Sequence, residues 1–532
     1  MHRIVVTNGL VVDGSGNQAY PGDIYITGDR ISGICREGSR EQAEYEGCRV
    51  IDAAGLVVTP GFVDIHTHSD TTILSCPSAD SKLRQGITTE IGGNCGYSLF
   101  PVAQSHLKEL KEFLSIFPGE RSYSWTGAGE FLDCIEDAAP AINFGTYVGH
   151  SAVRLAVKGF ERSAANVEEL AEMNALVLEA LDEGAVGLSL GLAYPPGSFA
   201  RDSELYTLMK ATASRGKIVS VHVRDEANSC VDSVQWVIDA ARKTGASVEI
   251  SHLKSMGKAN WGKVKRSLEL ISEARESGVD ITVDVYPYIA INTVLTSLLP
   301  ADVISGGIEV AKRKLQDRAT LQRTLEHLAK RSGSYGGWEN VVVASASNLK
   351  HPEEVVGKSI AEIAATRSKS PEQTTVDISL ESLGSTMIVC FSMNEEDVVE
   401  VFKAPFSMAG SDGKILCTEG PLSHGRPHPR NYGAFPRIIK WVVKQKKALT
   451  LEGAVRKMTS MPAERVGIER RGLIKVGNYA DLTIFSLDEL SDMASFENPH
   501  QYCEGIKCII VNGEVTFEGG KIATRNGKVL RL

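Results

Sequence analysis

The chain has 532 residues, of which 42% are hydrophobic and 23% are charged, so it is long enough for more than one structural unit and too apolar to be largely disordered. A formal net charge of -9 and a pI near 5.8 give no support for a nucleic-acid-binding surface, and no basic cluster with interleaved aromatic residues is present. A small molecule, rather than nucleic acid or a membrane, is therefore the expected partner.

The N-terminal segment MHRIVVTNGLVVDGSGN alternates like a first strand and turn, and it lacks the charged start and apolar run of a secretory signal. No window is long and apolar enough to span a bilayer. The ten cysteines are scattered without the paired spacing of a disulfide framework. We therefore predict a cytoplasmic protein with reduced thiols. The sequence leaves open whether it forms a homo-oligomer.

Both ends of the chain have the pattern of short alternating strands. Residues 1–58 contain RIVVTNGLVVDG, DIYITGDRISGI and RVIDAAGLVVTP, and residues 469–532 contain ADLTIFSL and KCIIVNGEVTFEGG. Two all-β ends that flank a larger unit most simply pair with each other. We predict that they form one small β-sandwich.

Between the two ends, residues 59–468, strand-like segments alternate with helical ones. The helical segments, such as 166–184 and 231–245, are amphipathic and end near a glycine. Eight strands alternating with helices predict an α/β fold, a (β/α)8 barrel of the TIM type. The predicted strands cover residues 62–69, 88–94, 144–150, 185–192, 217–223, 247–253, 281–287 and 406–412.

One connection in the barrel is too long for a loop. More than a hundred residues separate Pro287 from Phe406, and they contain helix and strand patterns of their own at 306–331, 338–346 and 386–391. Because structureless loops of this length are rare in compact domains, we predict an inserted subdomain at about residues 289–400.

Potential metal ligands stand at the ends of the predicted strands. In GFVDIHTHSD, His66 and His68 are two residues apart and point to the same face of a strand, where two imidazoles can share one metal ion. Four more residues stand at, or directly after, the C-terminal ends of other strands: Cys95, His222, His252 and Asp412. That end of a (β/α)8 barrel carries the active site, and imidazole, thiolate and carboxylate are the ligand set of zinc.

Each of these residues taken alone has a structural explanation. Cys95 could be a small buried hydrophobe, and Asp412 in AGSDG could shape a turn beside its glycines. His222 and His252 could be capping or core histidines. Six such coincidences on one rim of one barrel are much less expected than a single metal site, so the pattern predicts metal binding.

Motifs along most of the chain carry a family resemblance. They are GFVDIHTHSD, GGNCGYS, GHSAVR, GLSLGLAYPPGSFA, HVRDE, ISHLKS, DVYPY, GSDG, RPHPRNYGAFPR and the C-terminal EGAVRKMTSMPAERVGI. Together they resemble the N-acyl-D-amino-acid deacylases (D-aminoacylases) of the amidohydrolase superfamily. The resemblance is weakest in the predicted insertion, and GGNCG and RPHPR are its most specific motifs.

The resemblance implies metal-binding roles for five of the residues. His66 and His68 match the ligands of a weakly held metal position, and Cys95 matches a thiolate ligand between two positions. His222 and His252 match the ligands of a tightly held zinc ion. The implied cofactor is one tightly bound Zn2+, with a second, weaker position left open.

The resemblance also implies how the substrate is bound. Asp412 matches an aspartate that is both a ligand and the proton shuttle. Lys254, Tyr286 and Arg430 match residues that hold the substrate's α-carboxylate, although without the family Lys254 and Arg430 would be interpreted as solvated cations. After VYPY the family often has a Gly-Ser pair, whereas this chain has IAINT, so Asn292 stands at the place of the serine.

The implied reaction is zinc-dependent hydrolysis of the amide bond of N-acyl-D-amino acids, which gives a free D-amino acid and a carboxylic acid. Zinc lowers the pKa of water toward ~7, which makes hydroxide accessible at neutral pH. Asp412 would act first as general base and then as general acid.

Three alternatives remain. A cyclic amide hydrolase of the hydantoinase or dihydroorotase type typically bridges two metals with a carboxylated lysine on the fourth strand, but VGLSLGLAYPP contains no lysine. A nucleobase deaminase would use the acid in HVRDE, but it leaves Cys95, Lys254 and Arg430 without roles. A non-catalytic scaffold should have lost ligands, and this chain retains all six. His150, at the end of the third predicted strand, is interpreted as structural.

Overall fold

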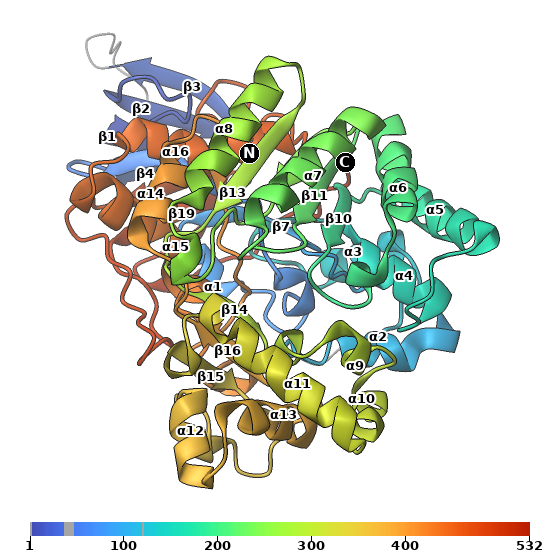
Figure 1. The fold of residues 1–532 in the computed structure, drawn as a ribbon. Helices are drawn as coiled ribbons and strands as arrows, with labels where there is room; N and C mark the ends of the chain where they lie inside the picture. The colour runs from blue at the N-terminus through green and yellow to red at the C-terminus, as the bar shows by residue number, and fades with distance from the viewer. Residues whose placement is uncertain (1–2, 37–46, 120–121) are drawn as a thin grey trace.

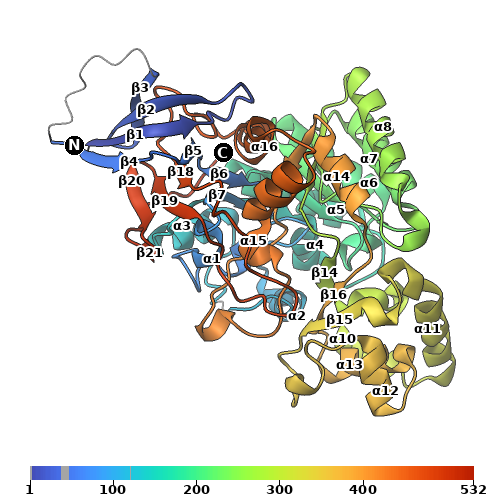
Figure 2. The same ribbon diagram turned by 90° about the vertical axis from the view of Figure 1, so that its left-hand side faces the viewer.

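A computed structural model describes residues 3–36, 47–119 and 122–532 (Figure 1). Residues 37–46 of the predicted N-terminal β segment lie outside the described residues. Figures 1 and 2 show a central barrel with a sheet built from both chain ends on one side and the inserted subdomain on the other. The insertion therefore lies away from the terminal sheet and beside one end of the barrel.

The barrel has the predicted eight parallel strands, and the third of them is interrupted at Tyr147. Its first piece pairs with the second strand and its second piece pairs with the fourth. Tyr147 N donates to Gly92 O at 3.0 Å, which keeps the two pieces in line. The strands are β6 (Phe62–Asp64), β7 (Ile87–Gly92), β8 (Asn143–Thr146) with β9 (Val148–Gly149), β10 (Gly187–Gly191), β11 (Ile218–His222), β12 (Val248–Ile250), β13 (Ile281–Val285) and β17 (Ser407–Ala409).

The barrel closes between its first and last strands through the backbone of the predicted site residues. Asp412 N donates to His66 O at 2.8 Å, and His68 N donates to Gly413 O at 2.7 Å. Closure of the barrel thus places His66 and His68, which follow β6, directly beside the aspartate that follows β17.

A buried ion cluster stabilises the same closure between the first and last barrel strands. Lys82, on the short helix α1 (Asp80–Leu83), has its Nζ 2.9 Å from Asp64 Oδ2, 2.7 Å from Glu90 Oε1 and 2.7 Å from Ser411 Oγ. All four residues are fully buried. A buried ammonium is tolerated only when it is paired and hydrogen-bonded, so this cluster fixes β6, β7 and the segment after β17 relative to one another.

Helices surround the barrel. The predicted helix 166–184 is α5, whose N-cap Asn166 forms a reciprocal capping box with Glu169, and the predicted helix 231–245 is α7, which ends at Gly245 with a φ of 72°. The helices outside the insertion are α1, α2 (Leu107–Phe113), α3 (Ala128–Asp137), α4 (His150–Lys158), α5 (Val167–Asp182), α6 (Asp202–Ser214), α7 (Cys230–Thr244), α8 (Lys263–Glu276), α14 (Glu395–Lys403), α15 (Arg430–Arg437) with a π-helical continuation (Ile438–Gln445), α16 (Leu451–Met458) and α17 (Ser460–Arg465).

The long connection after β13 folds as an inserted subdomain, as predicted. It contains a three-stranded antiparallel sheet in the order β14-β16-β15, covered by helices (Figures 1 and 2). Its elements are β14 (Ile291–Val294), α9 (Ala301–Ile304), α10 (Ile308–Lys314), α11 (Arg318–Arg331), β15 (Val341–Ser345), α12 (Ile360–Arg367), α13 (Pro371–Glu381) and β16 (Met387–Cys390). The first of these strands passes directly beside the predicted site.

The two chain ends pair with each other, as predicted, through β5 of the N-terminal part, which runs antiparallel to β18 of the C-terminal part. The strands form a single nine-stranded sheet, in which β1 pairs with β2, β4 and β5. This sheet has a hydrophobic core of its own. They are β1 (Arg3–Val11), β2 (Tyr20–Thr27), β3 (Arg30–Arg36), β4 (Arg49–Asp52), β5 (Val57–Pro60), β18 (Leu482–Phe485), β19 (Ile506–Val511), β20 (Glu514–Glu518) and β21 (Lys521–Ile522).

The last residues of the chain leave this sheet and return to the barrel. Phe144 N, in β8, donates to Lys528 O at 2.9 Å and Leu530 N donates to Phe144 O at 2.7 Å. The C-terminal segment therefore extends the barrel wall. The boundaries at residues 58 and 468 stay predictions.

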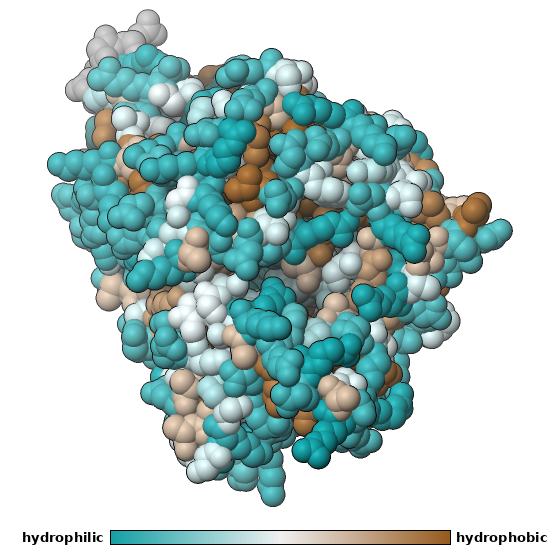
Figure 3. All heavy atoms as spheres, in the orientation of Figure 1, coloured by the Kyte–Doolittle hydropathy of each residue, from teal (hydrophilic) through white to brown (hydrophobic). Residues whose placement is uncertain are grey.

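Hydrophilic side chains cover most of the face shown in Figure 3, and hydrophobic residues there form scattered patches. Scattered apolar residues are normal on a protein surface. Among the described residues, no helix is both long and apolar enough to cross a membrane.

Candidate active site

The predicted site residues lie around one cavity, with an empty volume of about 550 Å³, where the barrel strands end. Its walls come from the barrel loops and from β14 of the insertion. The predicted residues that line it are His68, Cys95, His222, His252, Lys254, Tyr286, Asn292, Asp412 and Arg430. His66 is fully buried at the edge of this set, with its ring centroid 4.9 Å from that of His252. The fold thus brings together residues that are up to 364 positions apart, from His66 to Arg430.

The potential metal ligands point toward one another. Cys95 Sγ lies 3.3 Å from His66 Nε2 and 3.4 Å from His252 Nε2. Asp412 Oδ1 lies 3.2 Å from His68 Nε2 and 3.7 Å from His66 Nε2. Three sets of ligand atoms each lie within 4.8 Å of one another: His66, His68 and Cys95; Cys95, His222 and His252; His66, His252 and Asp412. Because the sets share members, they outline one ion position or two adjoining ones.

Buried carboxylates orient two of the imidazoles. Asp284 Oδ2 lies 2.8 Å from His66 Nδ1, and Glu226 Oε1 lies 3.0 Å from His252 Nδ1. A carboxylate on Nδ1 fixes the ring tautomer and leaves Nε2 as the ligating nitrogen, which is the usual arrangement around a metal-bound histidine. Sequence reasoning missed Asp284 and connected Glu226 only with the deaminase alternative.

Two further imidazole nitrogens lack a protein partner. His68 Nδ1 and His222 Nδ1 are buried and have no hydrogen-bond partner within the described part of the chain. A buried polar atom without a partner is costly, and clusters of such atoms point to a missing ligand or ion. Together with one thiol and one carboxylate, these imidazoles form a donor set that fits Zn2+.

The electrostatics favour the ligating forms of these groups. Burial lowers the pKa of His68 and of His222 to about 4 in each case, so both rings are neutral at pH 7. Burial and the carboxylates of Asp412 and Asp284 raise the pKa of the Cys95 thiol well above its usual range, so its proton leaves only when a cation replaces it. Although burial opposes ionisation of Asp412, the Arg430 guanidinium and the histidines hold the pKa of that carboxyl well below its usual range.

Three of the six predicted ligands have a strained backbone. Cys95, His252 and Asp412 have φ angles of 56°, 36° and 51°, in the left-handed region that residues with a side chain rarely adopt. Such conformations cost on the order of 1–3 kcal/mol each and gather at functional sites. Next to Cys95, a Cβ on Gly93 would meet Tyr147 O at 2.3 Å, so the GGNCG motif is needed for the close approach of this loop to the interrupted third strand.

The two predicted carboxylate-binding cations have partners inside the protein. Lys254 Nζ lies 2.5 Å from Glu226 Oε1, and Arg430 Nη1 lies 2.7 Å from Asp412 Oδ2. Lysine has three donors and arginine has five, so each cation keeps donors that can face a ligand in the cavity. Neither ion pair could be predicted from the sequence, since the paired residues lie 28 and 18 positions apart in the chain.

The other two predicted substrate residues complete the cavity wall. The Tyr286 ring lies 5.0 Å from the guanidinium carbon of Arg430 and 5.6 Å from Lys254 Nζ, within the range of cation–π attraction. Asn292, in β14, donates from Nδ2 to Ile388 O at 2.9 Å. Its side chain is therefore held by the insertion, at the wall of the cavity.

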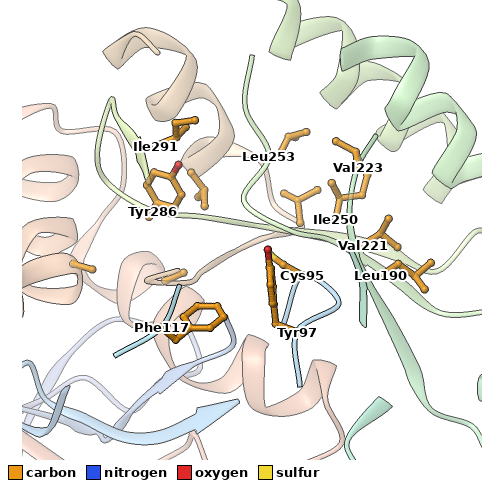
Figure 4. Packing of buried hydrophobic residues seen from close by; sticks show 14 of the residues in the cluster. Cys95, Tyr97, Phe117, Leu190, Val221, Val223, Ile250, Leu253, Tyr286 and Ile291 are labelled. Carbon is orange, nitrogen blue, oxygen red and sulfur yellow. The ribbon is translucent and has the colours of Figure 1, made fainter. Parts of the chain in front are cut away.

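A second, apolar cavity with an empty volume of about 630 Å³ adjoins the first. Both are lined by Tyr97, Ile116, Tyr194 and Val294. Figure 4 shows Tyr97, together with Phe117 and Tyr286, around the same space as Cys95. Sequence reasoning missed these aromatic residues, because only the folded chain shows which of its aromatic side chains border the site.

His150 has the structural role that the sequence suggested. Its Nε2 lies 2.8 Å from Glu204 Oε1, and Arg154 Nη1 lies 2.5 Å from Glu204 Oε2. The three side chains are buried and tie α4 to α6, outside the walls of the cavity. Burial opposes ionisation of Glu204, but its contacts with His150 and Arg154 lower the pKa of this carboxyl, so it forms an ion pair with Arg154.

Comparison with known proteins agrees with this geometry. The profile of the amidohydrolase family matches residues 49–517. The N-acyl-D-glutamate deacylase of Alcaligenes xylosoxydans xylosoxydans is 32% identical over 537 residues, which covers 99% of this chain and 96% of that protein. The D-aminoacylase of the same organism is 32% identical over 517 residues, with 97% and 94% covered.

Solved structures give the same relationship. The N-acyl-D-glutamate deacylase from Bordetella bronchiseptica, solved with zinc and a phosphonate inhibitor that mimics the tetrahedral intermediate, superposes with a TM-score of 0.83 at 30% identity and covers 99% of both chains. The likeness extends over the barrel, the insertion and the terminal sheet. The chain therefore belongs to the amidohydrolase family and, within it, to the N-acyl-D-amino-acid deacylases that its motifs resemble.

Proposed function

We propose that this protein is a zinc-dependent deacylase that hydrolyses the amide bond of N-acyl-D-amino acids and releases a D-amino acid and a carboxylic acid. One observation carries the proposal: Cys95 Sγ lies 3.3 and 3.4 Å from the Nε2 atoms of His66 and His252, and both rings are backed by buried carboxylates. This is an arrangement for holding a cation at the end of the barrel, next to a cavity with two positive side chains.

The donor set supports zinc as the cofactor. We assign Cys95, His222 and His252 to a tightly held ion, because one thiolate with two imidazoles is the softest subset of the donors. His66 and His68, with Asp412, would hold a second ion more weakly. Bound zinc would polarise the amide carbonyl and lower the pKa of water from 15.7 toward about 7.

Asp412 would move the proton. Arg430 holds its Oδ2 at 2.7 Å, which leaves Oδ1 directed at His68 and His66. An ionised carboxylate in this position can take a proton from the attacking water and then pass it to the nitrogen of the leaving amino acid. The ion pair with Arg430 keeps the carboxylate ionised and fixes its orientation through both steps.

Lys254, Tyr286 and Arg430 would hold the α-carboxylate of the substrate. All three residues line the cavity, and Lys254 and Arg430 both lie near the Tyr286 ring. Charge-assisted hydrogen bonds from an arginine and a lysine are among the strongest contacts that a carboxylate can receive. Asn292 stands where the family often has serine, and its carbonyl oxygen would accept from the amide N–H of the substrate. With the carboxylate and the scissile carbonyl both fixed, the configuration at Cα decides where the side chain goes.

The cyclic amide hydrolase alternative lacks its characteristic residue. The fourth strand, β10, has the sequence GLSLG, without the lysine that would be carboxylated in that class. The deaminase alternative left Glu226 as its acid, yet this carboxylate lies 2.5 Å from Lys254 Nζ and 3.0 Å from His252 Nδ1, where it positions both groups. We further propose a cytoplasmic location, which the ten free thiols support. The sequence leaves the oligomeric state open.

The experiment that tests this function combines metal content with turnover. The purified enzyme is stripped with a chelator, reloaded with zinc and assayed for free amine on a panel of N-acetyl-D-amino acids. Zinc should restore activity, and Cys95→Ala should neither retain tight zinc nor turn over substrate. Full metal content and activity in Cys95→Ala would contradict the assignment of the site.

A further inference from the structure

A pair of cysteines outside the active site joins two loops of the barrel. Cys76 lies in the segment between β6 and α1, and Cys417 lies in the segment after β17. Their Sγ atoms are 3.0 Å apart, although 341 positions separate them in the chain. These segments follow His68 and Asp412, so the cysteine pair lies where the first and last barrel strands, β6 and β17, meet beside the active site.

The backbone on both sides holds the two sulfurs in place. Cys76 N donates to Thr72 O at 3.0 Å, and Cys76 O accepts from Ala79 N at 3.0 Å. On the other side, the hydroxyl of Tyr432 donates to Cys417 O at 2.7 Å. The neighbouring Leu416 N donates to Ser81 Oγ of α1 at 2.9 Å, which ties the two segments to each other. The sulfur contact is thus a consequence of the fold on both sides.

The surroundings make one sulfur the nucleophile and the other its proton donor. Cys76 Sγ shares a hydrogen bond with Cys417 Sγ and contacts Ser78 Oγ at 3.3 Å, and these contacts lower the pKa of Cys76 to about 6. The same contact raises the pKa of Cys417, which therefore keeps its proton. A thiolate in contact with a second thiol is the arrangement that reacts by forming a disulfide.

A small molecule in solution has limited access to the two sulfurs. Cys76 is 6% exposed and Cys417 is half-buried, so a small oxidant can approach the pair from the side of Cys417. Asp80 Oδ2, 3.8 Å from Cys76 Sγ, makes the pair formally a set of potential metal ligands as well. Two thiolates on one tetrahedral zinc stand about 3.8 Å apart at Zn–S bonds of about 2.3 Å, whereas a disulfide needs the two sulfurs to approach by only about 1 Å from their present positions. The geometry favours the disulfide.

We propose that Cys76 and Cys417 form a reversible disulfide, which links the loops after the first and last barrel strands when the protein meets hydrogen peroxide. The Cys76 thiolate attacks one peroxide oxygen, the O–O bond breaks, and the released hydroxide is protonated to water. The resulting Cys76 sulfenic acid is attacked by the Cys417 sulfur, so that the S–S bond forms, the S–O bond breaks and a second water leaves with the Cys417 proton. Two thiols and one peroxide give one disulfide and two waters, and a dithiol reductant reverses the change.

Peptide mapping tests the proposal directly, because trypsin places each cysteine in a peptide with no other cysteine: Cys76 in 50–82 and Cys417 in 415–430. Purified full-length enzyme, zinc-loaded, is treated with hydrogen peroxide, alkylated and digested without reductant. The expected product is a cross-linked pair of these peptides that has lost two hydrogens and that separates after addition of dithiothreitol. Recovery of the two peptides only as separate alkylated species would overturn the proposal, and so would protection of both thiols by a bound metal ion.

A stability measurement on the same samples gives a second readout. The cross-link should raise the melting temperature by a few degrees, on the order expected for closing a long loop, and the rise should disappear in Cys76→Ser and Cys417→Ser. Cys134→Ser, which removes a partly exposed thiol on α3, is the matched control and should keep the rise. An equal peroxide-induced shift in all three variants would overturn the assignment to this pair.

Discussion

Replacing Asp412 by asparagine is the sharpest test of the proposed chemistry. The substitution keeps the size of the side chain and an acceptor for Arg430, but it removes the group that would move the proton. Cys95, His222 and His252 do not depend on it, since Cys95 lies 3.4 Å from His252 Nε2 and the three form a ligand set of their own. We therefore expect the tight zinc to stay bound while catalysis fails.

The size of the effect follows from the lost proton transfer. General acid–base catalysis contributes about 10²–10⁴ in rate, so kcat of Asp412→Asn should fall by that factor, which corresponds to a rise of about 2.7–5.4 kcal/mol in activation free energy. The weakened contact with Arg430, an ion pair of 2.7 Å, should cost about 1.5–3 kcal/mol of stability at most, because a neutral amide oxygen still faces the guanidinium. Turnover should thus change far more than folding.

The assay measures zinc by mass spectrometry, kcat and KM on an N-acetyl-D-amino acid, and the melting temperature. Asp492→Asn is the control, because Asp492 pairs with Arg437 at 2.9 Å outside the cavity and its loss breaks a similar ion pair. It should leave kcat unchanged. A value of kcat for Asp412→Asn within about threefold of wild type would remove Asp412 from the proton transfer, and loss of the tight zinc would make it chiefly a ligand.

Three further substitutions test the cation, the oriented histidine and the structural ion cluster. Arg430→Met should lower kcat on every substrate, because Asp412 loses the guanidinium that orients it, and should also raise KM for N-acyl-D-amino acids by about tenfold or more. The rise in KM should be much smaller for substrates whose α-carboxylate is an amide, and an equal change in KM for both substrates would refute the contact. Asp284→Asn removes the carboxylate 2.8 Å from His66 Nδ1 and should weaken binding of the second, weaker zinc ion by about 10–100-fold in a chelator competition, whereas unchanged affinity for that ion would show that it does not position the ring. Glu204→Gln should cost about 1.5–3 kcal/mol in urea unfolding, because a neutral amide replaces the carboxylate that receives the charge-assisted hydrogen bond of the buried Arg154. Since folding lowers the pKa of Glu204 below 4.5, its contribution is complete above pH 4.5 and is lost as the pH falls further, so the difference between wild type and variant should shrink in acid; a constant difference would refute the ionic role.

The sequence predicted the positions of the site residues because barrel topology converts strand ends into neighbours. His66, Cys95, His222 and His252 each follow or end a strand whose apolar pattern is visible in the sequence. Parallel strands that close into a barrel bring those ends to one rim, so residue type and position along a strand suffice to predict the cluster. The same argument does not give the pairing of side chains within it.

The side-chain pairs of the site could not be predicted from the sequence, because they join segments that are distant in the chain. Asp284 is an acidic residue inside an apolar strand, which hints at a buried partner but does not name His66, 218 positions earlier. Lys254 and Arg430 were predicted as free donors for a substrate, whereas the folded chain pairs them with Glu226 and Asp412. Opposite charges find each other only after the loops that carry them are placed.

Two features of the backbone also could not be predicted from the sequence. The third barrel strand was predicted as one segment, but it is interrupted at Tyr147, where the chain passes close to Gly93 of the cysteine loop. Strand propensity reports a preference averaged over neighbours and does not contain this local packing. The positive φ of Cys95 is similar, since only the flanking glycines of GGNCG hint at an unusual turn.

The measurement that bears most directly on the proposed function is the ratio of kcat/KM for the two enantiomers of one N-acetyl amino acid on zinc-loaded enzyme. A carboxylate held by Lys254 and Arg430 and a scissile carbonyl held at the metal fix two points of the substrate, so only one configuration at Cα can place its side chain in the cavity. We expect hydrolysis of the D form with kcat/KM on the order of 10² or more above that of the L form, the ratio that corresponds to about 2.7 kcal/mol of transition-state binding. Equal rates for the D and L forms, or no hydrolysis of either while a cyclic amide is opened, would contradict the assignment.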